Sequence, residues 1–140
     1  KGNSSYPLHE IEKLEPAERA SRHLEVSDLR RDKKWQQENP EKWRHYIELS
    51  LASRRSDRDA EGAMKQLIAR KSHDTYDRLS QIQIPVLLAG GEFDGVAPVE
   101  NMQAIANQIK SSEARFYQGG HMFLVQDKRA YPEIIEWLKS

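Results

Sequence analysis

The chain contains the stretch Ile84-Pro85-Val86-Leu87-Leu88-Ala89-Gly90-Gly91, and this stretch decides the fold class. A short, nearly continuous apolar run that ends in glycine is typical of a strand buried on both faces of a sheet. We therefore expect a strand over residues 84–89. Pro98 then favours the start of a helix. The apolar face of that helix would consist of Val99, Met102, Ile105, Ala106 and Ile109.

A second strand and a second helix follow in the same order. Residues 114–117 are a short strand candidate, the pair Gly119-Gly120 ends it, and Pro132 favours the start of a last helix. The order strand, helix, strand, helix favours parallel strands joined by a right-handed crossover. Residues 82–140 are therefore predicted to form an α/β segment with about two parallel strands.

The first half of the chain is polar, and its apolar residues recur at helical spacing. Pro16 and the pair Asn39-Pro40 are typical helix starts, because asparagine caps a helix and proline is tolerated at its first position. Behind Pro40, one helical face would carry an apolar stripe that most simply serves packing. The stripe consists of Trp43, Tyr46, Ile47, Ser50 and Leu51.

Two further helices are expected before the first strand. The residues Ser56-Asp57-Arg58-Asp59 resemble a capping box ahead of another apolar stripe, and a short helix is expected over residues 74–80. We therefore predict two domains, a mostly helical region at residues 1–81 and the α/β segment at residues 82–140.

Composition and charge argue against several classes of function. Lys and Arg number 22, as do Asp and Glu, so the net charge is zero and provides no general attraction to nucleic acid or to an anionic membrane. No apolar run approaches the roughly 18 residues of a membrane span. The absence of cysteine excludes disulfides, thiolate metal sites and a cysteine nucleophile. We expect a cytoplasmic protein without a cofactor or a bound metal.

Two polar residues follow the two predicted strands. Asp94 lies just past the first strand and His121 just past the second. Because adjacent parallel strands end at the same edge of a sheet, both loops should meet there. An Asp in this place can accept a hydrogen bond from His Nδ1, which fixes the tautomer and supports the His as a general base. Taken singly, Asp94 could be a turn residue before Gly95, and His121 a loop residue without a task.

At these residues the chain resembles the α/β-hydrolase superfamily. Residues 82–98 look like the penultimate core strand and acid loop of that family, and residues 119–124, with Asp127 and the helix over 131–138, look like its histidine loop and final helix. The resemblance implies that Asp94 is the acid and His121 the base of a catalytic triad. It also implies that residues 1–81 are similar to the cap that many members insert before the acid strand.

The chain departs from the family at the nucleophile. The family places it before the acid, in a G-x-S-x-G turn between a strand and a helix. The sequence has no such pentapeptide, and Gly2-Asn3-Ser4-Ser5-Tyr6 lacks the second glycine. We therefore expect the C-terminal portion of a larger hydrolase that acts on a small-molecule ester, lactone or C–C bond. By itself this portion should be inactive, because the covalent step needs the nucleophile.

The missing strands predict a partner. A sheet of about two strands is marginal by itself and leaves a hydrophobic strand edge exposed. We expect residues 84–89 to pair either with the missing N-terminal half of the hydrolase or with a second copy of the chain.

Two other functions remain as alternatives. The polar helical half could be a protein-interaction module with a vestigial hydrolase-like tail. The basic residues Arg19, Arg22, Arg30, Arg31, Lys33 and Lys34 could contact phosphates. However, Glu18, Glu25, Asp28 and Asp32 alternate with them, which is typical of a solvated face. No binding of nucleic acid is therefore expected.

Overall fold

The computed structural model describes residues 6–52 and 57–140, and these residues form two compact units. The first, here called the sheet unit, contains Tyr6, Ser27–Leu29 and Thr75–Ser140. The second, the helical unit, contains Pro7–Val26 and Arg30–Asp74. The predicted domain boundary between residues 81 and 82 stays a prediction, since these units are defined by contacts and not by independent folding.

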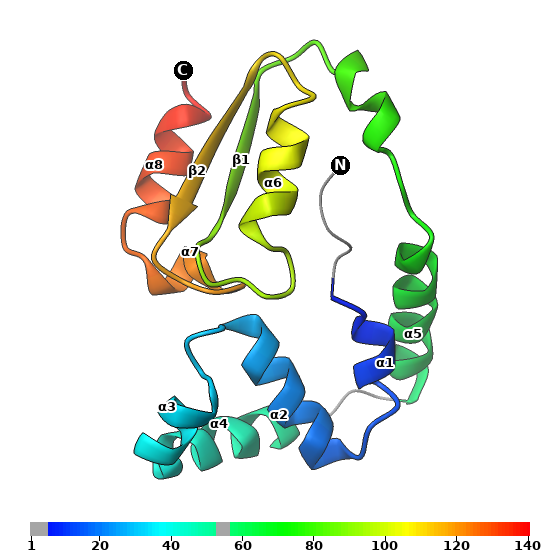
Figure 1. Ribbon diagram of the computed structural model, residues 1–140, viewed down its shortest axis with the longest axis vertical. Coiled ribbons are helices and arrows are strands. Elements are labelled where there is room, and N and C mark those ends of the chain that lie inside the picture. Colours follow the sequence, from blue (N-terminus) through cyan, green and yellow to red (C-terminus); the bar gives the residue numbers. More distant parts are fainter. Residues whose placement is uncertain (1–5, 53–56) are drawn as a thin grey trace. The chain divides into compact units, whose positions relative to one another are not determined.

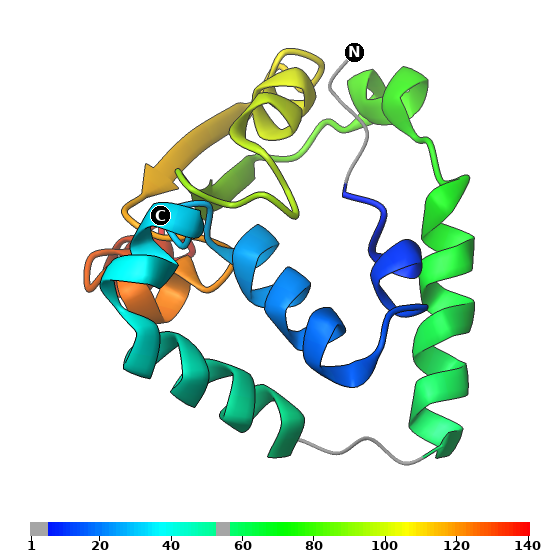
Figure 2. The same ribbon diagram turned by 60° about the horizontal axis from the view of Figure 1, so that its bottom comes forward.

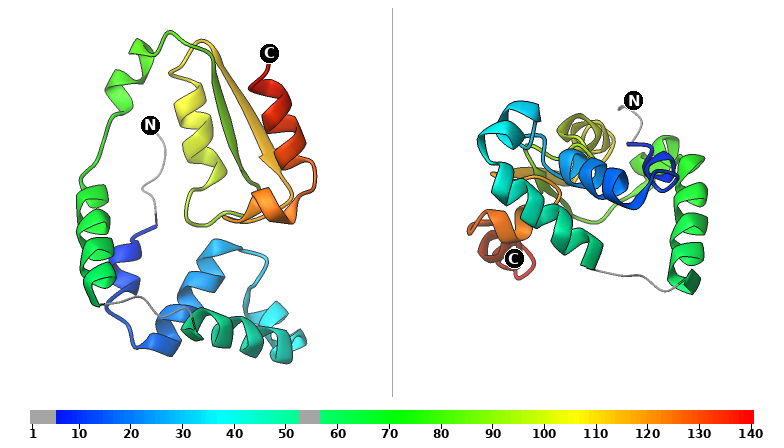
Figure 3. Two further views of the ribbon diagram at one scale, coloured as in Figure 1. Left: turned by 180° about the vertical axis from the view of Figure 1, so that it is seen from behind. Right: turned by 90° about the horizontal axis from the view of Figure 1, so that it is seen from below.

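The sheet unit is an α/β structure built on two parallel strands. Strand β1 (Val86–Gly91) pairs with β2 (Ser112–Tyr117) from Val86↔Ser112 to Gly91↔Tyr117. Helix α6 (Val99–Ala106) connects them, and α8 (Ala130–Trp137) follows the short helix α7 (Phe123–Gln126). Helices α6 and α8 lie on opposite sides of the two strands (Figures 1 and 3). The predicted fold class and the parallel pairing are confirmed.

The packing of α6 on the sheet explains one of the glycines. A Cβ built on Gly90 would lie 1.8 Å from the terminal methyl of Met102, so the helix approaches the strand through the space that a side chain would fill. The core of this unit contains Val96, Ile109, Tyr117 and Ala130, all buried. Met102 of the predicted apolar face thus packs on the strand, whereas Ile109, predicted on the same face, is buried beyond the end of α6.

Four predicted boundaries in the sheet unit are wrong by two residues. Strand β1 extends to Gly91 and not only to residue 89, and β2 begins at Ser112 and not at residue 114. The first strand begins at Val86 and not at Ile84, whose side chain is 68% exposed. The last helix begins at Ala130, so Pro132 is its third residue. Proline is tolerated anywhere in the first turn, where an amide hydrogen would have no partner within the helix. The short helix before β1 is the 3-10 helix η1 (Tyr76–Gln81).

The helical unit consists of short helices. They are α1 (Leu8–Ile11), α2 (Pro16–Ser27), α3 (Lys33–Glu38), α4 (Pro40–Ala52) and α5 (Asp57–Lys71). Helix α1 lies beside α5 (Figure 2). The predicted starts at Pro16 and Pro40 are confirmed. The predicted capping residue Ser56 lies outside the described residues.

The predicted packing stripe of α4 is not a buried one. No residue of α4 is buried, and the side chain of Leu51 is 41% exposed. Its aromatic residues contact α3 instead, because the Trp35 ring stacks on Tyr46 with centroids 6.3 Å apart and meets Trp43 edge-on at 6.5 Å. The stripe thus predicted that Trp43 and Tyr46 lie on the packing side of α4, but not that this side stays partly exposed to solvent.

Candidate functional site

The structure brings Asp94 and His121 together. The Nδ1 atom of His121 lies 2.9 Å from Oδ2 of Asp94. Because a carboxylate only accepts hydrogen bonds, this contact places the ring proton on Nδ1. The Asp94 side chain is only 5% exposed whereas that of His121 is 50% exposed. A buried acid therefore holds an accessible imidazole. That either residue is catalytic stays a prediction.

Backbone groups hold the Asp94 carboxylate in place. Its Oδ1 atom accepts hydrogen bonds from the amides of Val96 at 2.8 Å and Ala97 at 3.0 Å. Such side-chain-to-backbone bonds are typical of Asp in turns, so the turn interpretation of Asp94 describes its local geometry. The other oxygen, Oδ2, remains directed at His121. One carboxylate thus closes its own loop and orients the histidine ring.

The acid loop and the histidine loop are tied to each other through their backbones. The Glu92 amide donates to the Tyr117 carbonyl at 2.9 Å, and the Phe93 amide donates to the Gly119 carbonyl at 2.9 Å. These bonds continue the pairing of β1 and β2 beyond the strand ends. They explain why two residues 27 positions apart meet.

A third segment, Ser27–Leu29, completes this edge of the sheet. The His121 amide donates to the Ser27 carbonyl at 2.6 Å, and the Leu29 amide donates to the Phe93 carbonyl at 2.9 Å. Asp28 is 3% exposed, and its side chain accepts a hydrogen bond from Gln126 Nε2 at 3.0 Å. Sequence reasoning missed this segment, because Asp28 is one of several acids in a polar stretch and carries no local signal.

Glycine makes these close contacts possible. A Cβ on Gly120 would lie 2.0 Å from the Ser27 carbonyl oxygen and 2.7 Å from the Asp28 Cα. A Cβ on Gly91 would lie 2.2 Å from the Gly120 oxygen. These obstacles are backbone atoms, which cannot turn aside as a flexible side chain can. The Gly119-Gly120 pair therefore does more than end a strand, since it lets three chain segments touch.

Two other carboxylates near the loops have structural partners. Asp127 accepts from both the side chain and the amide of Arg129 and from the Gln118 amide, and these bonds, led by that of the Arg129 side chain, hold its pKa well below the usual aspartate range. Glu92 accepts from the Gln118 side chain. Asp127 is the residue that ends α7, and both carboxylates thus bind groups of the loops in which they lie.

The paired Asp94 and His121 can perform proton transfer. With Nδ1 bonded to Asp94, the lone pair of the ring lies on Nε2, on the opposite side of the imidazole. Nε2 can take a proton from a nucleophile, and the buried carboxylate then stabilises the imidazolium. Within residues 6–52 and 57–140, no group of three or more His, Cys, Asp or Glu could hold a metal ion.

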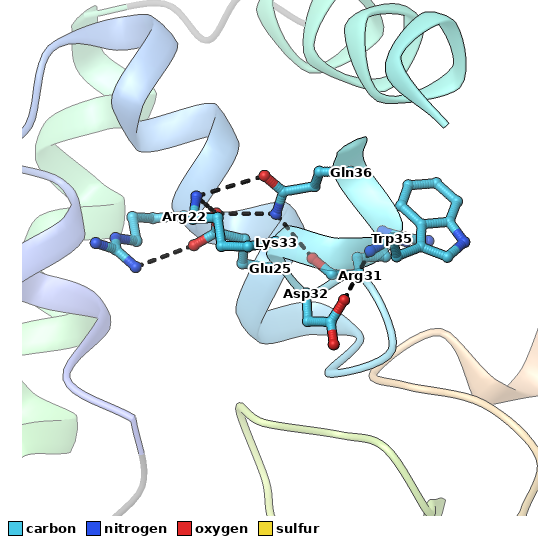
Figure 4. Close-up of polar contacts among 7 residues, drawn as sticks. All are labelled: Arg22, Glu25, Arg31, Asp32, Lys33, Trp35 and Gln36. Carbon is cyan, nitrogen blue, oxygen red and sulfur yellow. Dashed lines mark hydrogen bonds and ion pairs between the residues drawn. The ribbon is translucent and has the colours of Figure 1, made fainter. Parts of the chain in front are cut away.

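Part of the basic stretch predicted as an alternative site is paired with acidic residues of the same stretch. In the helical unit, Glu25 bonds to Arg22 at 3.0 Å, to Lys33 at 2.8 Å and to Gln36 at 3.1 Å (Figure 4). Partial burial by itself raises the pKa of Glu25, but the hydrogen bonds from Lys33 and Gln36 outweigh it and leave the pKa below its usual value. Arg31 lies 5.0 Å from the centroid of the Tyr46 ring. These contacts favour a solvated helix face, on which acidic residues neutralise the basic ones, over a phosphate-binding site.

In the part of the chain that the structure describes, no helix combines the length and apolar character that a bilayer crossing requires.

Comparison with known proteins defines the class of fold. No protein-family model matches the chain, and no curated protein matches it. The α/β arrangement is nevertheless shared with a solved structure described as "Est816 as an N-Acyl homoserine lactone degrading enzyme". The TM-score is 0.62 at 21% sequence identity, over 96% of this chain and 55% of that chain. The chain thus spans about half the length of that protein, and the similarity is one of fold.

Proposed function

We propose that the chain carries the acid and the base of an α/β-hydrolase triad, Asp94 and His121. The observation that carries the proposal is the bond of 2.9 Å between a buried carboxylate and a half-exposed imidazole at the carboxyl ends of two parallel strands. A surface ion pair would expose both partners, and a core histidine would be covered. Here only the base is accessible to a reacting group.

The proposed substrate is a small molecule with an ester, lactone or C–C bond to be hydrolysed. The similar solved protein is described as degrading an N-acyl homoserine lactone, which supports a lactone or an ester first. In the proposed reaction His121 Nε2 removes the proton of a nucleophile as that group attacks the substrate carbonyl. The same nitrogen then returns the proton to the leaving group, while Asp94 keeps the ring oriented. Nε2 next takes a proton from a water molecule that attacks the acylated nucleophile, and it returns this proton to the nucleophile as the acid is released.

The nucleophile is proposed to come from outside these 140 residues. The sequence contains no G-x-S-x-G turn, and the chain matches only 55% of the similar solved chain. The part that supplies the nucleophile would pair with β1, which among the described residues pairs with β2 alone. Light scattering distinguishes this partner from a second copy of the chain, because a stable monomer of the 140-residue chain would exclude pairing between copies.

The test begins with the coding sequence upstream of Lys1, where a G-x-S-x-G motif in the same reading frame is expected. The protein that includes this motif should hydrolyse a chromogenic ester or an N-acyl homoserine lactone. His121→Ala should lower its kcat by about 10³-fold or more, as should Asp94→Asn, which leaves the ring in the wrong tautomer. The matched control is His45→Ala, an exposed histidine of α4 that should leave kcat unchanged.

The 140-residue chain alone should show no turnover above background. Turnover by this chain alone, lost on His121→Ala, would falsify the proposal that the nucleophile lies elsewhere. Unchanged kcat in the His121→Ala form of the longer protein would exclude His121 as the base.

A further inference from the structure

A short hydrogen-bond relay connects a buried carboxylate to the backbone beside His121. Gln126 Oε1 accepts from the Gly120 amide at 2.7 Å, and Gln126 Nε2 donates to Asp28 Oδ2 at 3.0 Å. Gln126 and Asp28 lie 98 residues apart in the sequence. All three residues belong to the sheet unit.

The chemistry of the two ends fixes the orientation of the Gln126 amide. A backbone N–H only donates and a carboxylate only accepts, so the amide must turn its oxygen to Gly120 and its nitrogen to Asp28. A neutral acceptor in place of Asp28 could satisfy the same donor with less desolvation, because burying a carboxylate costs free energy. A carboxylate binds the amide more strongly, since hydrogen bonds to charged groups are about twice as strong as neutral ones.

The same segment contacts the histidine backbone directly. The His121 amide donates to the Ser27 carbonyl, and Gly120 touches Asp28 without room for a side chain. The Gly120 amide is therefore held by Gln126, which binds Asp28, and the His121 amide is held by Ser27 itself. The position of the ring over Asp94 follows from the position of this backbone.

We propose that Asp28 and Gln126 are positioning residues, which hold the histidine loop so that His121 Nδ1 meets Asp94. The catalytic meaning of this inference rests on the proposed function. Its structural content does not, because the relay can be measured in the 140-residue chain without turnover. A failed hydrolysis assay and a failed positioning test are therefore separate results.

The experiment uses NMR on the full 140-residue chain and follows two signals. Amide hydrogen exchange at Gly120 and His121 reports on the loop, and the Nδ1–H resonance of His121 reports on the bond to Asp94. Asp28→Ala should speed exchange at Gly120 and His121 by about tenfold or more, the factor expected on loss of a charge-assisted hydrogen bond. It should also broaden or abolish the Nδ1–H resonance, while amides of β1 and β2 keep their rates.

An exchange of the two side chains gives the sharper test. Gln126→Glu alone sets two carboxylates against each other and should speed exchange as Asp28→Ala does. In the double variant Asp28→Asn/Gln126→Glu, the asparagine donates to the new carboxylate, which still accepts from Gly120, so slow exchange and the Nδ1–H resonance should return. The matched control is Glu100→Ala, an exposed acid of α6, which should change neither signal.

Two outcomes would overturn the inference. One is an Asp28→Ala chain that is folded and exchanges at Gly120 and His121 at the original rates. The other is a double variant that exchanges as fast as Gln126→Glu. If Asp28→Ala does not fold, the comparison between Gln126→Glu and the double variant decides, because both keep a polar side chain at each position.

Discussion

The loops around Asp94 and the cluster around Glu25 both surround a carboxylate with hydrogen-bond donors, but they build that environment differently. Asp94 is held by two backbone amides and one imidazole, and its side chain is 5% exposed. Glu25 is held by side chains of Arg22, Lys33 and Gln36, and the side chains of Lys33 and Arg22 are 75% and 51% exposed. The first arrangement is set by the path of the backbone, the second by flexible surface groups.

This difference indicates where chemistry is to be expected. A group held by backbone amides loses little freedom when a substrate binds, because its geometry is already fixed. Long exposed side chains must first be ordered, and salt screens their charges. The loops at the end of β1 and β2 therefore form the better candidate site, although the Glu25 cluster contains more charged groups.

The largest expected effect comes from placing a methyl group where the loops touch. Gly120→Ala would set a Cβ 2.0 Å from the Ser27 carbonyl oxygen, so the backbone must shift. We expect a loss of about 3 kcal/mol or more in the free energy of unfolding, at the upper end of overpacking costs. Urea denaturation, monitored by circular dichroism, measures this change in the free energy of unfolding.

The helical unit supplies the control for this variant. Gly62 lies in α5, and a Cβ there would meet nothing within 4 Å. Gly62→Ala should stabilise the chain by roughly 0.5–1 kcal/mol, because alanine loses less backbone entropy in a helix. Equal effects of the two substitutions would contradict the claim that the loop glycines are required by close backbone contact.

The sequence predicted the two strands and the meeting of Asp94 with His121 for a definite reason. A continuous apolar run that ends in glycine is typical of a strand, and parallel strands bring their carboxyl ends together. Asp94 and His121 each stand directly behind such a strand, so topology alone makes them neighbours. Local sequence patterns are enough to predict a contact when the topology of the strands determines it.

The sequence could not predict the third segment of the site. Asp28 meets Gln126 across 98 residues, and neither residue stands in a pattern that distinguishes it from its polar neighbours. The stripe on α4 failed for a related reason, since periodicity shows which face of a helix is apolar but not what covers it. Contacts between distant segments depend on the whole packing arrangement.

An intermediate effect is expected at Asp127, which resembles Asp94 in burial but has a cationic partner. The Arg129 side chain, helped by the amides of Arg129 and Gln118, lowers the pKa of Asp127 in the folded chain. A lowered folded pKa contributes stability above the ordinary aspartate pKa of about 3.9 and loses it as the pH falls below that value. The Asp127→Asn variant should therefore be less stable than the natural chain near neutral pH, and this difference should shrink as acid is added.

Urea midpoints measured at about pH 6 and about pH 3 would test this expectation. Arg129→Gln is the matched control, because it removes the group that lowers the pKa most and should reproduce part of the same pH dependence. A difference between the natural chain and Asp127→Asn that stays constant over this range would show that the carboxylate is not stabilised by its charge.

The smallest effect is expected at Glu25, the centre of the exposed cluster. Glu25→Gln removes the charge that Arg22 and Lys33 share, but both cations extend into solvent and keep their hydration. We expect a loss of about 0.2–1 kcal/mol in the free energy of unfolding at low salt. In roughly 1 M salt the loss should nearly disappear, because the screening length falls to about 3 Å.

Urea denaturation at the two salt concentrations measures this loss, with Glu48→Gln, an exposed carboxylate of α4, as the control. The salt dependence carries more information than the size of the loss. A hydrogen bond from Gln36 Nε2 can still reach the new amide oxygen, so what Glu25→Gln removes is charge. A loss near 2 kcal/mol that persists in high salt would show that Glu25, like Asp94, is a carboxylate fixed by its surroundings. The contrast between the two regions would then be wrong.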